Sequence, residues 1–251
     1  MMKQILFEEV KKSFGQVTAI NGLNLSILEG EVYAFLGHNG AGKTTTLRLL
    51  LGLLEADKGN ITVFGNHPIK DGNAVRSVCG VLSEDVGLYE PLTVYDNLMY
   101  YADIYGMSRV ASNKRIDELL NRFDLFDKKG LIIKGFSTGM KKKVALIRAM
   151  LHKPQILLLD EPTNGLDPVS TTDLRNMLST LAKEQGTTII MTTHNLEEVQ
   201  KICDKISIFR RGKNIFTDSI SSLKDSNHYM EHGQFSLEKL YMDIEIKGAN
   251  E

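Results

Sequence analysis

The first third of the chain places short apolar runs between turn residues, a pattern typical of β-strands. Residues 5–7, 23–27 and 31–36 are predicted strands, and the second of these alternates apolar and polar positions with a period of two. A glycine-rich segment, residues 37–42, follows the third strand, and apolar positions at helical spacing continue over residues 47–54. The pattern therefore predicts three strands, a glycine-rich loop and a helix, in this order.

Helical patterns dominate the middle of the chain. Residues 92–152 lack strong strand signals, and apolar positions recur at helical spacing over residues 116–123. Apolar strand patterns resume at residues 156–159, 187–190 and 206–209. The chain as a whole thus predicts an α/β fold whose core is interrupted by a helical insertion.

A further helix is expected before residue 186. Asp167 can cap its N-terminus, Pro168 can occupy its first position and Gly186 can end it. Two shorter helical patterns lie beyond residue 220. We therefore expect one domain over residues 1–220, with a helical subdomain at about 92–152, and a short C-terminal helical tail over residues 221–251.

Composition adds limits on the partners of the chain. The 251 residues are 42% hydrophobic and 24% charged, as in ordinary soluble globular proteins. A formal net charge of −1 argues against nucleic acid as a partner, since proteins that bind it usually carry a clear basic excess. One basic run, Lys141-Lys142-Lys143, departs from this balance, and we expect it to form a solvated helix face.

The cysteines and the apolar runs bear on the compartment. Cys79 and Cys203 are far apart in apolar surroundings, which favours small core residues in a reducing compartment over a disulfide or a metal pair. The N-terminal segment lacks the apolar stretch of a signal peptide, and no run approaches the roughly 18 apolar residues that cross a bilayer. If the protein acts at a membrane, another chain must supply the spans.

The glycine-rich segment matches the P-loop pattern, between a predicted strand and a predicted helix. Its glycines let backbone N–H groups turn toward phosphate oxygens, and the following helix N-terminus adds a partial positive charge. Lys43 is expected to reach the β- and γ-phosphates, and the Thr44 hydroxyl to ligate Mg²⁺. The residues expected to bind nucleotide here are Gly37, Asn39, Gly40, Ala41, Gly42, Lys43, Thr44 and Thr45.

Two acidic residues follow the apolar run at residues 156–159. A buried strand would deliver Asp160 to its end, where a carboxylate can hold the Mg²⁺ shell. Glu161 is then placed to orient and deprotonate the attacking water. Together with the P-loop, this pair predicts a P-loop NTPase, but it leaves kinases, GTPases and helicases open.

Three further segments distinguish between these classes. Residues 136–140 (FSTGM), ahead of a predicted helix, resemble the signature motif of ABC ATPases. Residues 164–167 (NGLD) resemble the D-loop of that family, and residues 192–194 (TTH) resemble its switch histidine. In order and spacing, the chain is similar to an ABC ATPase from about residue 3 to about residue 215. The resemblance implies a P-loop NTPase core of ABC type with an antiparallel β subdomain, and ATP and Mg²⁺ as cofactors.

The family resemblance also implies a shared site. In this family two ATPase domains pack head to tail, as a homodimer or as a heterodimer with a related ATPase, and enclose two ATP molecules. Ser137 and the Gly139 amide would meet the γ-phosphate held by the partner. His194 would contact the same phosphate and the water. Phe14 matches the aromatic residue that stacks on adenine, although core packing is an alternative for it.

Two departures from the family pattern concern the same site. The signature carries Thr138 and Met140 where the commonest form has Gly and Gln. Glu84 aligns with the glutamine that touches Mg²⁺ in relatives, and its carboxylate can serve as a Mg²⁺ ligand while adding negative charge near the phosphates.

An aromatic-rich segment indicates how such an ATPase would reach a membrane protein. Five of the eight tyrosines fall between Tyr89 and Tyr105. Family members receive a short helix of the membrane subunit here, and an apolar groove with aromatic walls suits an amphipathic helix. An aromatic-rich helical core is the alternative. We expect a permease to dock near residues 84–105 and to hold the chain on the cytoplasmic face of the cell membrane.

Within the family, the chain looks most like the ATPase subunits of bacterial ABC-2-type exporters. Residues 164–168, Glu84 and the segment 237–241 carry this resemblance. One rival is a soluble ABC ATPase of translation or DNA repair, but these carry two ATPase domains or long coiled coils. Importer subunits are a second rival, and many have a longer C-terminal domain.

Overall fold

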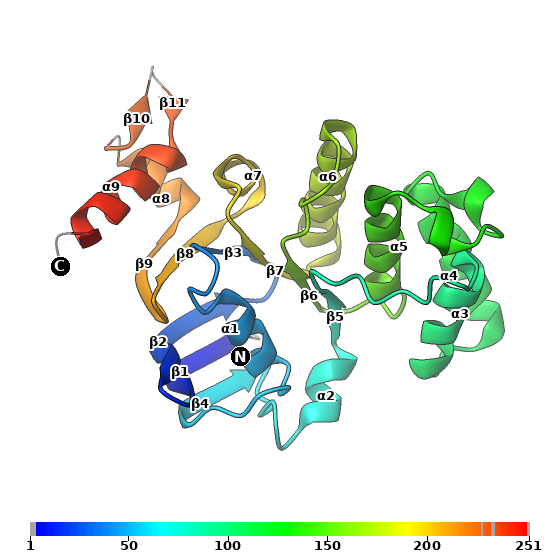
Figure 1. Ribbon diagram of the computed structural model, residues 1–251, viewed down its shortest axis with the longest axis horizontal. Coiled ribbons are helices and arrows are strands. Elements are labelled where there is room, and N and C mark those ends of the chain that lie inside the picture. The colour runs from blue at the N-terminus through cyan, green and yellow to red at the C-terminus, as the bar shows by residue number, and fades with distance from the viewer. Residues whose placement is uncertain (1–3, 227, 232–233, 250–251) are drawn as a thin grey trace.

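The computed structural model describes residues 4–226, 228–231 and 234–249. Its first layer is an antiparallel sheet in which β1 (Gln4–Phe14) lies between β2 (Val17–Leu28) and β4 (Lys58–Val63). The two predicted N-terminal strands belong to this sheet (Figure 1). The polar first half of β4 hid its strand character from the hydrophobic pattern, and only pairing with β1 makes it a strand.

A six-stranded sheet forms the centre of the molecule. Its order is β5 (Cys79–Leu82), β6 (Ile156–Asp160), β7 (Thr188–Thr193), β3 (Val32–Leu36), β8 (Lys205–Arg210) and β9 (Lys213–Ser219). Neighbours are parallel except for β9, which pairs antiparallel with β8. Every residue of β3, β6 and β7 is buried, which explains why β3 and residues 156–159 of β6 are continuous apolar runs rather than alternating ones.

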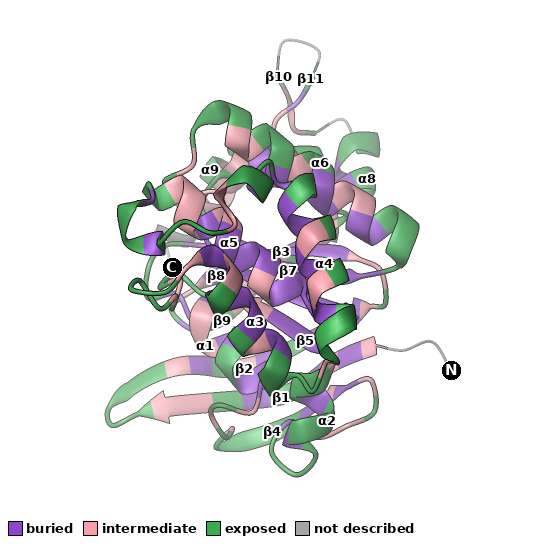
Figure 2. Ribbon diagram, turned by 90° about the vertical axis from the view of Figure 1, so that its right-hand side faces the viewer, coloured by how far each residue is buried: buried purple, intermediate pink, exposed green. Residues whose placement is uncertain are grey.

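Successive residues of the central strands pack into two different cores. In β3, Ala34 joins the core shared with the helical insertion, whereas Phe35 joins the core shared with the antiparallel sheet and α1 (Lys43–Leu50). This division follows from the period of two in a strand. Figure 2 shows buried residues concentrated on the central strands and exposed residues on the outer helices. The predicted α/β fold with an antiparallel subdomain is confirmed.

The helical insertion lies beside the central sheet (Figure 1). It comprises α3 (Val94–Ile104), α4 (Arg109–Arg122), two 3₁₀ turns, η1 (Phe126–Lys128) and η2 (Ile133–Gly135), and α5 (Thr138–Met150). Helix α2 (Gly72–Ser77) precedes it, at the start of β5. The predicted helical character of residues 92–152 is confirmed, and the boundary of a separate subdomain stays a prediction.

Helix α6 (Pro168–Gln185) begins and ends as its sequence predicts. The Asp167 carboxylate accepts a hydrogen bond from the Ser170 backbone N–H at 2.9 Å, and Pro168 takes the first turn. Gly186 ends the helix with φ +64°, a conformation that costs glycine little. The cap fixes where the loop of residues 161–167 ends and α6 begins.

The C-terminal tail packs against α7 (Leu196–Ile202). It contains α8 (Ile220–Asp225), a short hairpin of β10 (Met230–Glu231) and β11 (Gln234–Phe235), and α9 (Leu237–Ala249). The Gln200 amide donates to the Phe235 carbonyl at 2.8 Å and accepts from the Leu237 N–H at 2.9 Å. Both helical patterns of the tail are therefore confirmed. The division at residue 220 stays a prediction, and both of its units extend beyond the described residues.

Two further expectations concern cysteines and membrane spans. Cys79 and Cys203 are both buried and unpaired, as expected of core residues, and burial raises the pKa of the Cys79 thiol to about 12. Within the part of the chain that the structure describes, no helix combines the length and the apolar composition that crossing a bilayer requires.

Candidate nucleotide-binding and catalytic site

A cavity of about 190 Å³ opens at the carboxyl ends of β3, β6 and β7. Parallel sheets bind ligands at this edge, because loops from several strands converge there. The lining residues are Ala19, His38, Asn39, Gly40, Ala41, Gly42, Lys43, Thr44, Thr45, Glu84, Asp160, Glu161, Asn164 and His194. The fold thus brings together almost the whole P-loop and three segments that follow it by 40 to 150 residues in the chain, at Glu84, residues 160–164 and His194.

The glycines of the P-loop have two different reasons to be glycine. Gly42, the N-cap of α1, has φ +110°, and a Cβ there would lie 2.6 Å from the Ala19 carbonyl oxygen. A Cβ on Gly37 would lie 2.3 Å from the Phe209 carbonyl oxygen. Gly40 has φ +81° but no atom within 4 Å of such a Cβ. The first two are needed for packing, and the third only for its backbone conformation.

This contrast predicts unequal effects of alanine in the absence of nucleotide. Gly40→Ala should lower the free energy of unfolding by about 1–2 kcal/mol, the cost of a left-handed conformation in an L-residue. Gly42→Ala should lower it by more than about 3 kcal/mol, because a steric clash with the β2 backbone adds to the strain. Urea unfolding of both variants measures the difference, and equal losses would contradict the packing argument.

Lys43 lies at the start of α1 with its ammonium folded back onto the loop. It donates hydrogen bonds to the carbonyl oxygens of Gly37 at 2.5 Å and of His38 at 3.2 Å. Burial lowers the pKa of this ammonium below its usual value, while the carboxylates of Glu161 and Asp160 act in the opposite direction. The loop therefore holds a cation at the floor of the cavity, where phosphate oxygens would contact it.

Thr44 and Asp160 form the group of oxygens best suited to a metal ion. The Thr44 hydroxyl donates to Asp160 Oδ2 at 3.0 Å, and the Thr192 hydroxyl donates to Asp160 Oδ1. Glu84 lines the same cavity. Hydroxyl and carboxylate oxygens are ligand types that Mg²⁺ accepts, so these three predicted ligands fit the ion by their chemistry.

Glu161 combines burial with an uncommon backbone conformation. Its φ is +49°, and its N–H bonds to the Thr192 carbonyl at 3.1 Å and lies 3.2 Å from the Thr192 hydroxyl. The residue is only 8% exposed. Its Oε2 accepts no hydrogen bond from a described residue, although His194 Nδ1 lies 3.1 Å away. A buried carboxylate at the cavity wall, with an imidazole beside it, is a candidate general base.

Thr192 is a residue that sequence reasoning missed. Through its hydroxyl and its carbonyl, it holds both Asp160 and Glu161 from the neighbouring strand. The available signal was a polar residue near the end of a fully buried strand, two positions before His194. The side chain of His194 itself is 64% exposed.

Phe14, Ser137 and Gly139 lie outside the cavity. Phe14 ends β1 at a hairpin and is 49% exposed, so the alternative of core packing is wrong for it. Ser137 caps α5, and its hydroxyl accepts a hydrogen bond from the Met140 N–H at 3.3 Å. Gly139 is in the first turn of the same helix. Within one chain, the signature segment does not complete the site.

The expected solvated face of Lys141–Lys143 is wrong for Lys142. Its side chain is buried, and its ammonium donates to the carbonyl oxygens of Glu161 and Asn164, both at 2.6 Å. Lys141 on the next side of the helix pairs with Glu90 at 2.5 Å. The helical period turns the middle lysine toward the loop after β6, and a charge pattern does not reveal that contact.

The tyrosine-rich segment divides between core and surface. The rings of Tyr89 and Tyr100 pack edge to face with centroids 5.1 Å apart, and both side chains are exposed. Tyr105 stacks on His152 at 3.8 Å. The apolar residues Val94, Leu98 and Met99 between them are buried. The buried part of the segment is thus aliphatic, and an exposed tyrosine pair remains available to a partner.

Comparison with known proteins agrees with this geometry. The chain matches the family model described as "ABC transporter" over residues 20–164. It is 39% identical to the ABC transporter ATP-binding protein NatA of Bacillus subtilis, over 95% of this chain and 96% of that protein. It is 37% identical to the bacitracin transport ATP-binding protein BcrA of Bacillus licheniformis, over 89% and 72%. A solved ATP-binding subunit of an ABC transporter superposes with a TM-score of 0.86 at 27% identity, over 98% of this chain and all of that one.

Proposed function

This chain belongs to the ABC transporter family and is an ATPase, and on that premise we propose that two copies, or one copy and a related ATPase, enclose two Mg-ATP molecules and power export through a separate membrane subunit. The observation that supports a dimer is that Ser137 and Gly139 lie outside the cavity. One chain offers the P-loop and the proposed base in its cavity and leaves its signature residues outside it. Two chains packed head to tail would complete each other's sites.

The proposed roles follow from the contacts in the cavity. The P-loop amides and Lys43 bind the phosphates, and Thr44, Asp160 and Glu84 would hold Mg²⁺. When bound, Mg²⁺ neutralises charge on the β- and γ-phosphates. Glu161 would accept a proton from the attacking water through its carboxylate, which lies 3.1 Å from His194 Nδ1.

His194 and Phe14 are proposed to act at two other parts of the nucleotide. His194, beside Glu161 and mostly exposed, would contact the γ-phosphate and the water. Phe14, exposed at the hairpin after β1, would stack on adenine.

Export and membrane attachment rest on the relatives and on the tyrosine segment. BcrA is described as a bacitracin transport protein, which favours transport over a soluble role in translation or repair. The exposed Tyr89–Tyr100 pair lies within the segment from Glu84 to Tyr105, where the membrane subunit is proposed to insert an amphipathic helix. This attachment would place the chain peripherally on the cytoplasmic face of the membrane.

The dimer is tested with a variant that binds ATP but does not consume it. The Glu161→Gln protein should be monomeric without nucleotide, dimeric with Mg-ATP and monomeric with Mg-ADP, because ATP binds the dimer and shifts the equilibrium by mass action. Adding Ser137→Arg should abolish the dimer and leave ATP bound to each monomer. Light scattering with each nucleotide measures the mass of the particle.

A matched control separates the site from a general effect of an added arginine. Ser77 is exposed on α2, away from the cavity and from α5, so Glu161→Gln with Ser77→Arg should dimerise as the single variant does. A dimer that forms equally with Mg-ADP, or that survives Ser137→Arg, would contradict the shared-site proposal.

A further inference from the structure

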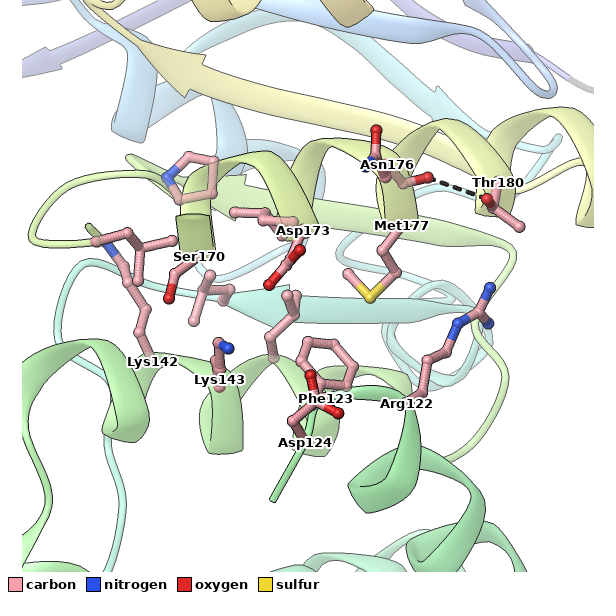
Figure 3. Close-up of a pocket in the computed structure, with 15 residues that line it drawn as sticks. Arg122, Phe123, Asp124, Lys142, Lys143, Ser170, Asp173, Asn176, Met177 and Thr180 are labelled. Carbon is pink, nitrogen blue, oxygen red and sulfur yellow. Dashed lines mark hydrogen bonds between the residues drawn. The ribbon is translucent and has the colours of Figure 1, made fainter. Parts of the chain in front are cut away.

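Lys142 connects α5 with the loop that follows β6. A cleft of about 280 Å³ lies between α5 and α6, and Lys142 rises from α5 at one end of it toward the loop after β6 (Figure 3). Its ammonium donates one hydrogen bond to the Glu161 carbonyl and another to the Asn164 carbonyl. The residue is 6% exposed, so the bond to the Glu161 carbonyl is buried and the bond to the Asn164 carbonyl is partly buried.

A buried ammonium of this kind is costly unless its hydrogen bonds are satisfied. Burial lowers the pKa of Lys142, and the carboxylates of Glu161, Glu84 and Asp160 oppose that effect. Its direct partners are nevertheless two backbone carbonyls and no carboxylate. Bonds to carbonyls fix the path of a backbone, so this lysine holds a loop in place as well as contributing charge.

The backbone that it holds is that of Glu161. Glu161 has a positive φ, and its N–H is already bonded to Thr192 on β7. Lys142 holds the carbonyl of the same residue from the side of α5. With both ends of the residue anchored, the backbone position from which its side chain starts is held beside the cavity. Asn164, the second partner, also lines that cavity.

We propose that Lys142 is a positioning residue for ATP hydrolysis, which sets the orientation of Glu161 according to the position of α5. The N-cap of α5 is Ser137, five residues before Lys142 and outside the cavity. A shift of α5 when a partner's nucleotide meets Ser137 would move the anchor of Glu161. This inference rests on the proposed roles of Glu161 and Ser137, and its test separates the two.

The primary test replaces the ammonium with an apolar side chain of similar length. Lys142→Met should lower kcat for ATP by about 10- to 100-fold, because small misplacement of a reacting group has effects of this size. KM and the dissociation constant for ATP should stay within about twofold, since Lys142 makes no contact with the P-loop. Steady-state ATPase rates and nucleotide titration on one preparation give both quantities.

Two variants serve as rescue and control. Lys142→Gln keeps two N–H donors without the charge and should recover most of the loss if hydrogen bonds to the carbonyls are what matters. Lys143 is the neighbouring residue, lies in the same cleft, and makes no hydrogen bond or ion pair with another described residue, so Lys143→Met should retain wild-type kcat. If Lys142→Met does not fold, as judged by circular dichroism, the Gln variant decides. A Lys142→Gln protein with wild-type KM, and with kcat between the wild-type value and the value expected for Lys142→Met, supports the inference.

A double variant shows whether Lys142 acts through Glu161. In a Glu161→Gln background, Lys142→Met should change the residual single-turnover rate by less than about twofold, since the group that it positions is already gone. Multiplicative losses would overturn the inference, as would wild-type kcat in Lys142→Met or a parallel loss of ATP affinity. If Glu161→Gln is inactive while Lys142→Met is fully active, the inference fails and the proposed function stands. If Glu161→Gln remains active, the proposed role of Glu161 fails instead.

Discussion

Glu161→Gln should lower the ATPase rate by about 10²- to 10⁴-fold, the usual contribution of a general base. The amide has the size of the carboxylate but cannot accept the proton of the attacking water. The Thr44–Asp160 pair and the backbone bonds of residue 161 do not involve the exchanged atoms, so ATP affinity should remain at the wild-type value. Steady-state rates and nucleotide titration of the same preparation test both parts.

Glu238→Gln is the matched control for this variant. Glu238 is exposed in the first turn of α9, and the same exchange there should leave the rate unchanged. A Glu161→Gln protein with more than about a tenth of wild-type activity would be too active for loss of a general base. His194, 3.1 Å from the Glu161 carboxylate, would then become the leading candidate for the base.

Lys43→Ala should abolish hydrolysis and weaken ATP binding by at least about tenfold. The variant removes a buried cation whose ammonium lies among the carbonyls of the P-loop, and charge-assisted bonds to phosphate are among the stronger ones. It also leaves the Asp160 and Glu161 carboxylates without their nearest positive charge on the P-loop. Both effects oppose the approach of a triphosphate.

The binding part of this prediction is measured by titrating the apo protein with Mg-ATP. Lys114→Ala is a suitable control, because Lys114 is exposed on α4 and makes no hydrogen bond or ion pair with another described residue. Unchanged ATP affinity in Lys43→Ala would show that the backbone amides alone hold the phosphates. Equal losses in both variants would point to net charge rather than to the P-loop.

Local sequence determined the segments that contain the proposed catalytic residues. A P-loop needs glycines at fixed offsets and a lysine at the start of a helix, and α6 needs a capping Asp, a Pro and a terminal Gly. These signals act over a few residues, so spacing along the chain is enough to predict them. Asp160 and Glu161 were predictable for the same reason, because a buried parallel strand is a continuous apolar run.

Tertiary structure decided which side chains meet and which are exposed. Glu84 and His194 enter the P-loop cavity only because β5, β6, β7 and β3 are adjacent in the sheet. Thr192 anchors two carboxylates from a neighbouring strand, and the buried Lys142 holds a loop 19 residues away. Phe14 is exposed because it ends a strand at a hairpin. Burial and hydrogen bonding depend on partners distant in the chain, so a pattern of neighbouring residues predicts the strand or helix but not its contacts.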